Sequence, residues 1–297
     1  MEHWRTLLSN FRMKLISLFH KSIGILKEHG IKKPKTDAEI IISGTLGISR
    51  IEIYLHRDLE VSQEVESKVL EIITRRALGE PLEYLLGYKY FWGMKFIVER
   101  GVLIPRFDTE SLIYIASRVC KSPKSILDIG TGTGIIGITL KKIFPKAYVV
   151  MTDISDIALN NCRENISSIL GDNIDDIKLI KTDVFKNLWD FTGWGKFDLI
   201  VSNPPYISEK DMDKLEPEVK KEPFNSLYGG VLGVDFYLKI ADKAKMFLSN
   251  RGKIILEVGD TNQSELVKSI FKLKGFRNFL QFKDVSNQTR GIVIFNF

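Results

Sequence analysis

The 297-residue sequence predicts an α/β fold, in which a mostly parallel sheet with an antiparallel last strand follows a small helical domain. After Pro105, short apolar runs alternate with amphipathic stretches, as in a parallel sheet covered by helices on both faces. Before this point, apolar side chains recur at three- and four-residue spacing, the period of one buried helix face. We expect residues 1–85 to form a helical domain, 86–104 a β-hairpin linker and 105–297 the sheet domain.

The N-terminal part begins with an amphipathic stretch. Its apolar stripe consists of Trp4, Leu7, Leu8, Phe11, Leu15, Leu18 and Phe19. Gly30 then supplies a helix stop, and Thr36 with Glu39 resembles a capping box that would open the next helix. A basic amphipathic helix could also lie on a membrane surface, but packing against neighbouring helices is the stronger expectation.

The remaining elements are predicted from short apolar and aromatic runs. Tyr88–Phe91 and Lys95–Val98 flank Trp92-Gly93-Met94, which indicates the hairpin. The expected strands are Ser125–Ile129, Tyr148–Asp153, Ile177–Thr182, Phe197–Ser202 and Lys253–Val258, with helices at Ile135–Phe144, Ile157–Ile166 and Phe236–Phe247. The connection between Asn278–Lys283 and Gly291–Asn296 is too short for a crossover helix, so these two strands should pair antiparallel.

Composition and charge narrow the class of protein. Hydrophobic residues make up 44% and charged residues 27% of the chain, which is typical of a soluble globular protein. No apolar run reaches the roughly 20 residues of a membrane-spanning helix, and basic residues interrupt any signal-peptide core. Cys120 and Cys162 are isolated, so we expect reduced thiols in a cytoplasmic protein that does not bind membranes. The net charge of +6 is scattered and is explained most simply by solubility.

The histidines lie outside the predicted sheet domain. All four of them, His3, His20, His29 and His56, fall in the N-terminal 56 residues. With no His or Cys cluster in the sheet domain, we expect no metal site. We also expect no side chain to act as an essential general base, because a base near pH 7 is usually a histidine, so the rate of a reaction in that domain should change little between about pH 6.5 and 8.5.

A glycine-rich segment follows the first expected strand and opens a helix. Its candidate ligand-binding residues are Gly130, Thr131, Gly132, Thr133 and Gly134. Glycines let a ligand approach the backbone, and the helix N-terminus offers free N–H groups to an anion. Read from Gly132, the segment also matches the dinucleotide fingerprint Gly-x-Gly-x-x-Gly, but a lone match of that kind is weak.

Acidic residues near the ends of three expected strands favour S-adenosylmethionine over a dinucleotide. Asp128 precedes the first glycine, where it can meet the ligand's amino group and would repel a pyrophosphate. Asp153 can accept both ribose hydroxyls, although it would do so for NAD as well. Asp183 can accept from the adenine amino group beside Val184. Each aspartate alone is more often a turn or cap residue. Together they lie at the edge where open parallel sheets bind ligands, which predicts a methyltransferase cofactor site.

The segment Asn203-Pro204-Pro205-Tyr206 follows the fourth expected strand. Two prolines can simply end a strand in a rigid turn. A functional explanation is that an amide nitrogen, a poor nucleophile, needs two fixed acceptors for its two N–H bonds. The Asn203 side-chain oxygen and the Pro204 carbonyl can provide them, with Tyr206 against the planar group. Such acceptors stabilise positive charge that develops on the nitrogen, and Asn203 would also border the methyl donor.

With these motifs the chain resembles the HemK/PrmC family of release-factor glutamine methyltransferases. The resemblance also rests on Gly79–Gly87, Phe91–Gly93, Leu103–Glu110, Glu222-Pro223, Gly229-Gly230 and Leu256–Gly259. It implies the Rossmann-like fold of class I methyltransferases and N5-methylation of the glutamine in the Gly-Gly-Gln loop of a release factor. It also implies that the helical domain grips that protein substrate. Phe107 and Leu232 depart from the family pattern, where proline and an acidic residue are usual, which bears on substrate fit.

Other functions remain open at this point. An adenine-N6 methyltransferase acting on nucleic acid would also bind a planar amino group, but it requires base flipping and a basic groove. The basic residues here are scattered, so nucleic acid is not the favoured partner. A glutamine methyltransferase acting on a ribosomal protein would use the same chemistry. A non-catalytic binding module is disfavoured, because the chain has the Asn203 motif and all three aspartates at the ends of the expected strands.

Overall fold

A computed structural model describes residues 13–171, 175–186, 188 and 196–296. The expected apolar stripe at Trp4, Leu7, Leu8 and Phe11 falls outside these residues. The chain divides into two compact units. One unit comprises Met1–Gly87 together with Pro217–Lys221, and the other comprises Tyr88–Glu216 and Glu222–Phe297. No sequence signal marks Pro217–Lys221 as part of the first unit.

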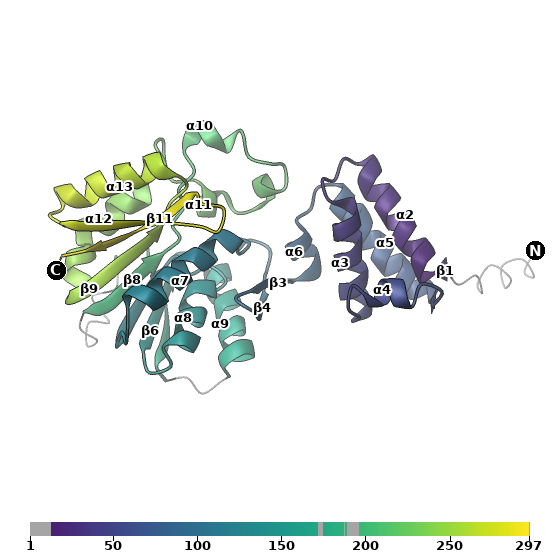
Figure 1. The fold of residues 1–297 in the computed structure, drawn as a ribbon, viewed down its shortest axis with the longest axis horizontal. Coiled ribbons are helices and arrows are strands. Elements are labelled where there is room, and N and C mark those ends of the chain that lie inside the picture. Colours follow the sequence, from purple (N-terminus) through teal and green to yellow (C-terminus); the bar gives the residue numbers. More distant parts are fainter. Residues whose placement is uncertain (1–12, 172–174, 187, 189–195, 297) are drawn as a thin grey trace, which may run out of the picture. The chain divides into compact units, whose positions relative to one another are not determined.

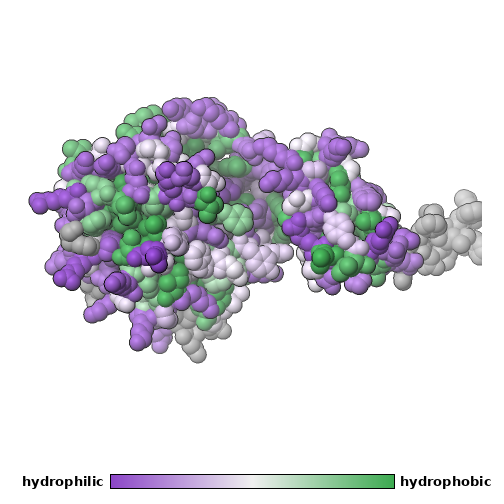
Figure 2. Space-filling model, viewed as in Figure 1, coloured by the Kyte–Doolittle hydropathy of each residue, from purple (hydrophilic) through white to green (hydrophobic). Residues whose placement is uncertain are grey.

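The first unit is helical (Figure 1). Its described elements are β1 (Met13–Lys14), α2 (Leu15–Glu28), α3 (Pro34–Leu46), α4 (Glu52–Leu55), β2 (Glu60–Val61), α5 (Gln63–Ala77) and α6 (Leu82–Leu86). Helices α2, α3 and α5 pack on one another around fully buried side chains such as Leu18, Ile41 and Val69. Strands β1 and β2 pair antiparallel. Figure 2 shows that apolar side chains also reach the surface of this unit. Ile51 and Leu55 are two exposed apolar residues of this unit.

Helix α3 begins earlier than the sequence predicts. The expected capping box at Thr36 and Glu39 is wrong, because the helix starts at Pro34 and its N-cap residue, Lys33, makes no side-chain cap. Proline suits the first turn, where its missing N–H would have no helical partner. Glu39 is buried and instead accepts hydrogen bonds from Arg50 and Tyr54.

An ion pair network attaches the segment Pro217–Lys221 to the helices of the first unit. The Arg76 guanidinium donates to Asp37 at 2.7 Å and to Glu218 at 2.8 Å. The Arg76 side chain is only 7% exposed. The Lys221 ammonium also donates to the Leu78 carbonyl oxygen at 2.7 Å. Two buried charges on Arg76 and Asp37 are tolerated because each has its partner.

The second unit contains the predicted hairpin and the predicted sheet. Strands β3 (Tyr88–Phe91) and β4 (Met94–Ile97) pair antiparallel, which confirms the hairpin. The described part of the chain forms a seven-stranded sheet in the order β10-β11-β9-β8-β5-β6-β7. Its strands are β5 (Ser125–Ile129), β6 (Tyr148–Asp153), β7 (Ile177–Lys181), β8 (Phe197–Ser202), β9 (Leu248–Glu257), β10 (Asn278–Lys283) and β11 (Thr289–Phe295). Strands β5 to β9 run parallel, while β11 is antiparallel to both β9 and β10, as predicted.

Helices cover both faces of this sheet (Figure 1). One face carries α7 (Glu110–Val119), α8 (Ile135–Ile143) and α9 (Asp156–Leu170), and the other carries α12 (Asp235–Phe247) and α13 (Thr261–Leu273). Successive strand residues point to opposite faces, so that Ile126 joins one core and Leu127 the other. Short helices lie in the connections of this unit: η1 (Phe107–Thr109), α10 (Glu209–Met212) and α11 (Phe224–Leu227). A further short helix, η3 (Val219–Lys221), belongs to the first unit. No helix in the described ranges is long and apolar enough to cross a membrane.

The strand order has its topological switch point between β5 and β8. The chain runs outward through β5, β6 and β7, then returns to the other side of β5 to form β8. At such a switch point, the loops that follow the two strands diverge and leave space at the carboxyl edge of the sheet.

Candidate active site

The carboxyl edge of the sheet brings the predicted site residues onto four neighbouring strands. Asn203 directly follows β8, and Asp128 is the next-to-last residue of β5. Asp153 ends β6, and Asp183 lies in the turn just after β7. These strands are adjacent in the order β8-β5-β6-β7. The expected reaction motif and the expected cofactor residues are therefore neighbours along one edge.

The glycine loop has two kinds of glycine. Gly130 has a φ of 70°, and no atom lies within 4 Å of the position that a Cβ would occupy there. Gly134 has a φ of 87°, and an added Cβ would lie 2.7 Å from the Cys162 sulfur. Both need the left-handed backbone that glycine adopts without strain. Gly134 thus permits close packing of α8 against α9, while Gly130 leaves open space at the surface of the loop.

Asp153 fixes the shape of this loop. Its Oδ2 accepts from the Gly132 N–H at 2.9 Å and its Oδ1 from the Ser155 N–H at 2.9 Å. The Thr131 N–H donates to the carbonyl oxygen of Thr152, the residue before Asp153, at 2.8 Å. Burial raises the pKa of Asp153, against the opposing effect of these backbone hydrogen bonds. The Ile154 N–H also contributes, so three of the roughly four acceptor positions of the carboxylate are used and one remains for a hydroxyl group.

Asp128 lies beneath the loop and is fully buried. Its Oδ2 accepts from the Thr131 hydroxyl at 2.6 Å and from the Gly137 N–H at 3.0 Å. Among the residues the structure describes, no hydrogen bond reaches its Oδ1. Burial raises the pKa of Asp128 to about 7. A buried carboxylate with one unsatisfied oxygen is destabilised, and it would gain from a nearby positive charge.

Asp183 and Val184 form the turn after β7. The Lys239 ammonium contacts the Asp183 carboxylate at 3.1 Å. Val184 is buried and has a φ of 56°, a left-handed conformation that is strained for a β-branched residue. Strain of this kind persists only where the surroundings impose it, and it often accompanies a functional turn.

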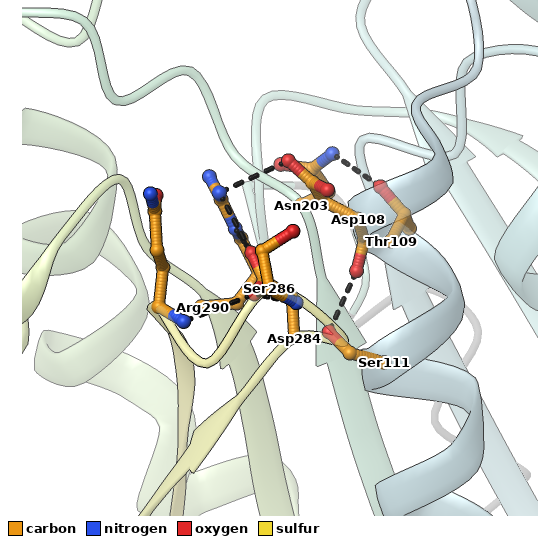
Figure 3. A network of polar contacts seen from close by, with 8 residues as sticks. Asp108, Thr109, Ser111, Asn203, Asp284, Ser286 and Arg290 are labelled. Carbon is orange, nitrogen blue, oxygen red and sulfur yellow. Dashed lines mark hydrogen bonds and ion pairs between the residues drawn. The ribbon is translucent and has the colours of Figure 1, made fainter.

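Asn203 is held by a side chain from another segment. Its Nδ2 donates to the hydroxyl oxygen of Thr109 at 3.3 Å (Figure 3). Thr109 is fully buried at the start of α7. Because the amide nitrogen is engaged by Thr109, the amide oxygen of Asn203 is left to accept a hydrogen bond from a substrate.

The rest of the reaction motif is packed tightly. Added Cβ atoms show how close the neighbours are: one at Gly229 would lie 2.7 Å from the Pro205 carbonyl oxygen and 2.8 Å from the Tyr206 Cα. The Gln263 amide donates to the Tyr206 carbonyl at 2.8 Å. Pro204 is buried, and burial raises the pKa of Tyr206 well above its ordinary value. The backbone of the motif is therefore fixed before any substrate binds.

Sequence reasoning did not identify a charged network beside Asn203. Arg290 contacts Asp108 at 3.0 Å and Asp284 at 2.9 Å, and Asp108 immediately precedes Thr109 (Figure 3). Asp284 and Arg290 flank the connection between β10 and β11. The sequence predicted that connection only as a tight link between strands. No local pattern places it beside Asn203, because the contact depends on how the sheet folds.

Comparisons with known proteins identify the family models and the relatives that this chain matches. Residues 17–87 match the PrmC N-terminal domain, and residues 94–221 match the methyltransferase small domain. The release factor glutamine methyltransferase of Geobacter sulfurreducens is 36% identical over 85% of this chain and 86% of its own length. That of Clostridium botulinum is 35% identical over 94% of this chain and 98% of its own length.

Solved structures show the same fold. The hMettl16 catalytic domain in complex with MAT2A 3'UTR hairpin 6 has a TM-score of 0.54 and 16% identity, covering 79% of this chain and 82% of that chain. A methyltransferase from Pyrococcus furiosus has a TM-score of 0.51 and 19% identity, covering 78% of this chain and 98% of that chain. At these identities the likeness concerns the fold alone. The sequence relatives are 35% and 36% identical over most of both chains, and the chain therefore belongs to the release factor glutamine methyltransferase family.

Proposed function

We propose that the protein transfers a methyl group from S-adenosylmethionine to the N5 amide nitrogen of the glutamine in the Gly-Gly-Gln motif of a release factor. The observation that carries this proposal is the Asn203 amide, whose nitrogen is bound by Thr109 and whose oxygen is left to accept. The names of its relatives support the same substrate. An amide acceptor at the edge of a methyltransferase sheet suits an amide nucleophile.

The residues beside the glycine loop fit the methyl donor. The unsatisfied Asp128 Oδ1 is suited to a nearby positive group, and the donor carries both an ammonium and a sulfonium. The open space at Gly130 suits the donor's carboxylate near the start of α8. The Asp153 carboxylate would accept hydrogen bonds from the ribose hydroxyls. The Asp183 carboxylate would accept a hydrogen bond from the adenine amino group beside Val184.

The chain's own residues would then orient the amide nitrogen. When bound, the donor supplies an activated methyl group on a good leaving group. The Asn203 Oδ1 and the Pro204 carbonyl oxygen would accept hydrogen bonds from the two N–H groups of the substrate amide. The Tyr206 side chain would limit motion of this planar amide group. Both acceptors stabilise positive charge on the nitrogen as the N–C bond forms and the methyl group leaves the donor sulfur, which favours the transition state over the bound substrate. The methylated nitrogen is strongly acidic and would then lose one proton to water.

The helical part has a separate proposed role. Residues 1–85 would grip the release factor, residues 86–104 would link the two parts, and residues 105–297 would bind the donor and carry out transfer. The two departures from the family pattern, Phe107 and Leu232, are exposed to 68% and 67%. Exposed apolar side chains at these positions are available to contact the protein substrate.

The experiment compares substrates and one variant. The protein is incubated with radiolabelled S-adenosylmethionine and, in parallel, with release factor, ribosomal protein or DNA. We expect label on release factor, and we expect Asn203→Ala to lower turnover by about a hundredfold or more with little change in donor binding. Asn160→Ala, on the exposed face of α9, serves as the matched control. Label on DNA alone would support an adenine methyltransferase. Lost donor binding with retained turnover would move Asn203 into the cofactor site.

A further inference from the structure

A buried carboxylate lies next to the reaction motif and has no role so far. Glu257 is the last residue of β9 and is fully buried. Within the described ranges, neither of its carboxyl oxygens has a hydrogen bond of ordinary geometry. An unsatisfied buried carboxylate is costly, and its presence beside a site requires a physical reason.

The strand register places Glu257 beside Asn203. Strands β8 and β9 are parallel neighbours, and Ser202 lies opposite Leu256. Asn203 directly follows Ser202 at the end of β8, and Glu257 directly follows Leu256 as the last residue of β9. In the order β9-β8-β5-β6, Glu257 is on the side of Asn203 that faces away from Asp128 and Asp153.

Thr109 contacts Asn203 and lies within the electrostatic influence of Glu257. Its hydroxyl oxygen accepts from the Asn203 Nδ2, so its own hydrogen must point to another acceptor. Among the neighbours that favour the charged form of Glu257, Thr109 has the largest effect. A threonine hydroxyl can donate to a carboxylate and accept from an amide at the same time.

We infer that Glu257 and Thr109 are positioning residues for amide methylation, and that the Glu257 carboxylate orients the Thr109 hydroxyl, which in turn fixes the orientation of the Asn203 amide. This inference rests on the proposed function. A carboxylate can only accept, whereas a protonated carboxyl can also donate to the Thr109 oxygen; the Thr109 hydroxyl then has no fixed direction, and the Asn203 amide can turn so that its NH₂ group faces the substrate N–H bonds. The charge also favours the transition state, because positive charge moves from sulfur toward the amide nitrogen and so toward Glu257.

Several charged or titratable groups surround Glu257. Arg290 on β11 and Arg106 before α7 favour its charged form, whereas Asp108 opposes it. Tyr206 after β8 and Tyr237 on α12 also lie within its electrostatic influence. Burial outweighs the favourable contacts and raises the pKa of Glu257 to about 7. The carboxylate therefore changes charge within the range in which the enzyme can be assayed.

The test is the pH dependence of the single-turnover rate on release factor at saturating donor, which keeps changes in donor affinity out of the measurement. We expect the wild-type rate to rise through about pH 7. Glu257→Gln should lower the plateau about tenfold, remove the rise, and leave the KM for release factor unchanged. Thr109→Val should behave like Glu257→Gln, and Thr109→Ser, which keeps the hydroxyl, should restore most of the rate.

The double variant Thr109→Val/Glu257→Gln should be no slower than the slower single variant, because both changes break the same chain of contacts. A wild-type rate and pH profile in Glu257→Gln would overturn the inference, as would losses that multiply in the double variant. If Glu257→Gln does not fold, as judged by circular dichroism, the comparison of Thr109→Val with Thr109→Ser decides in its place. If the wild-type protein methylates no release factor at any pH, the proposed function itself fails.

Discussion

Methyl-donor affinity should depend on pH through the charge of Asp128. With a pKa of about 7, this carboxyl is ionised in about one tenth of molecules at pH 6 and in about nine tenths at pH 8. If the positively charged donor binds only the ionised form, its affinity should rise about tenfold between these two values. The sign follows from the raised pKa, because protons must leave Asp128 before the donor can pair with it.

Isothermal titration calorimetry at pH 6, 7 and 8 measures this effect directly. The donor's own ammonium also titrates, but it does so equally with wild-type protein and with Asp128→Asn. The difference between the two proteins therefore isolates Asp128. We expect wild type to release close to one proton on binding at pH 6, and the variant to release none from this site. The reasoning is refuted if the two proteins show the same change of affinity with pH.

Three further predictions concern the loop, the buried carboxylate and the helical unit. Asp153→Ala should weaken donor binding by about 1.5–3 kcal/mol, as measured by calorimetry, because charged hydrogen bonds to the ligand are lost. Glu257→Gln should stabilise the protein at pH 8 by about 3 kcal/mol in urea unfolding, since the pKa of this group rises from 4.5 to about 7 on folding. Arg76→Ala should cost about 3–5 kcal/mol in the same assay, because it leaves the Asp37 carboxylate buried without its partner.

Each of these three predictions has a control or an outcome that would contradict it. The folded protein holds the Glu257 proton up to about pH 7, whereas the unfolded chain releases it from about pH 4.5, so stability is lost as the pH rises between these values. At pH 4 the Glu257→Gln difference should nearly vanish, and a constant difference would contradict the assigned pKa. Arg75→Ala, a more exposed position on the same helix, should cost less than about 1 kcal/mol. Unchanged donor affinity in Asp153→Ala would remove that residue from the ribose site.

Much of the sheet follows from local sequence, because buried parallel strands are continuous apolar runs. Ser125–Ile129, Tyr148–Asp153 and Phe197–Ser202 have the bounds that the sequence predicts. Strand β9 begins at Leu248, earlier than predicted, because the residues between Leu248 and Lys253 carry no apolar pattern that would indicate a strand. The position of Asn203 beside the glycine loop also follows, because parallel strands bring their carboxyl ends to one edge.

The partners of Asn203 could not be predicted in the same way. Thr109 and Glu257 stand in segments quoted for the family resemblance, yet neither has a local signal for its contact with the reaction motif. Their proximity arises from the strand order and from the packing of α7. The prediction of a flat pH profile rests on the positions of the histidines alone. Two fully buried carboxyls, Asp128 and Glu257, have pKa values near 7, and burial of this kind is set by the tertiary structure.

The central claim is tested most directly by locating the transferred methyl group. Purified protein, release factor and isotopically labelled S-adenosylmethionine are incubated, and the release factor is digested and sequenced by fragmentation mass spectrometry. The account predicts one labelled methyl group on the side-chain amide of the glutamine in the Gly-Gly-Gln motif, and almost none with Asn203→Ala. A methyl group on any other residue, or an unmodified release factor beside labelled nucleic acid, would contradict it.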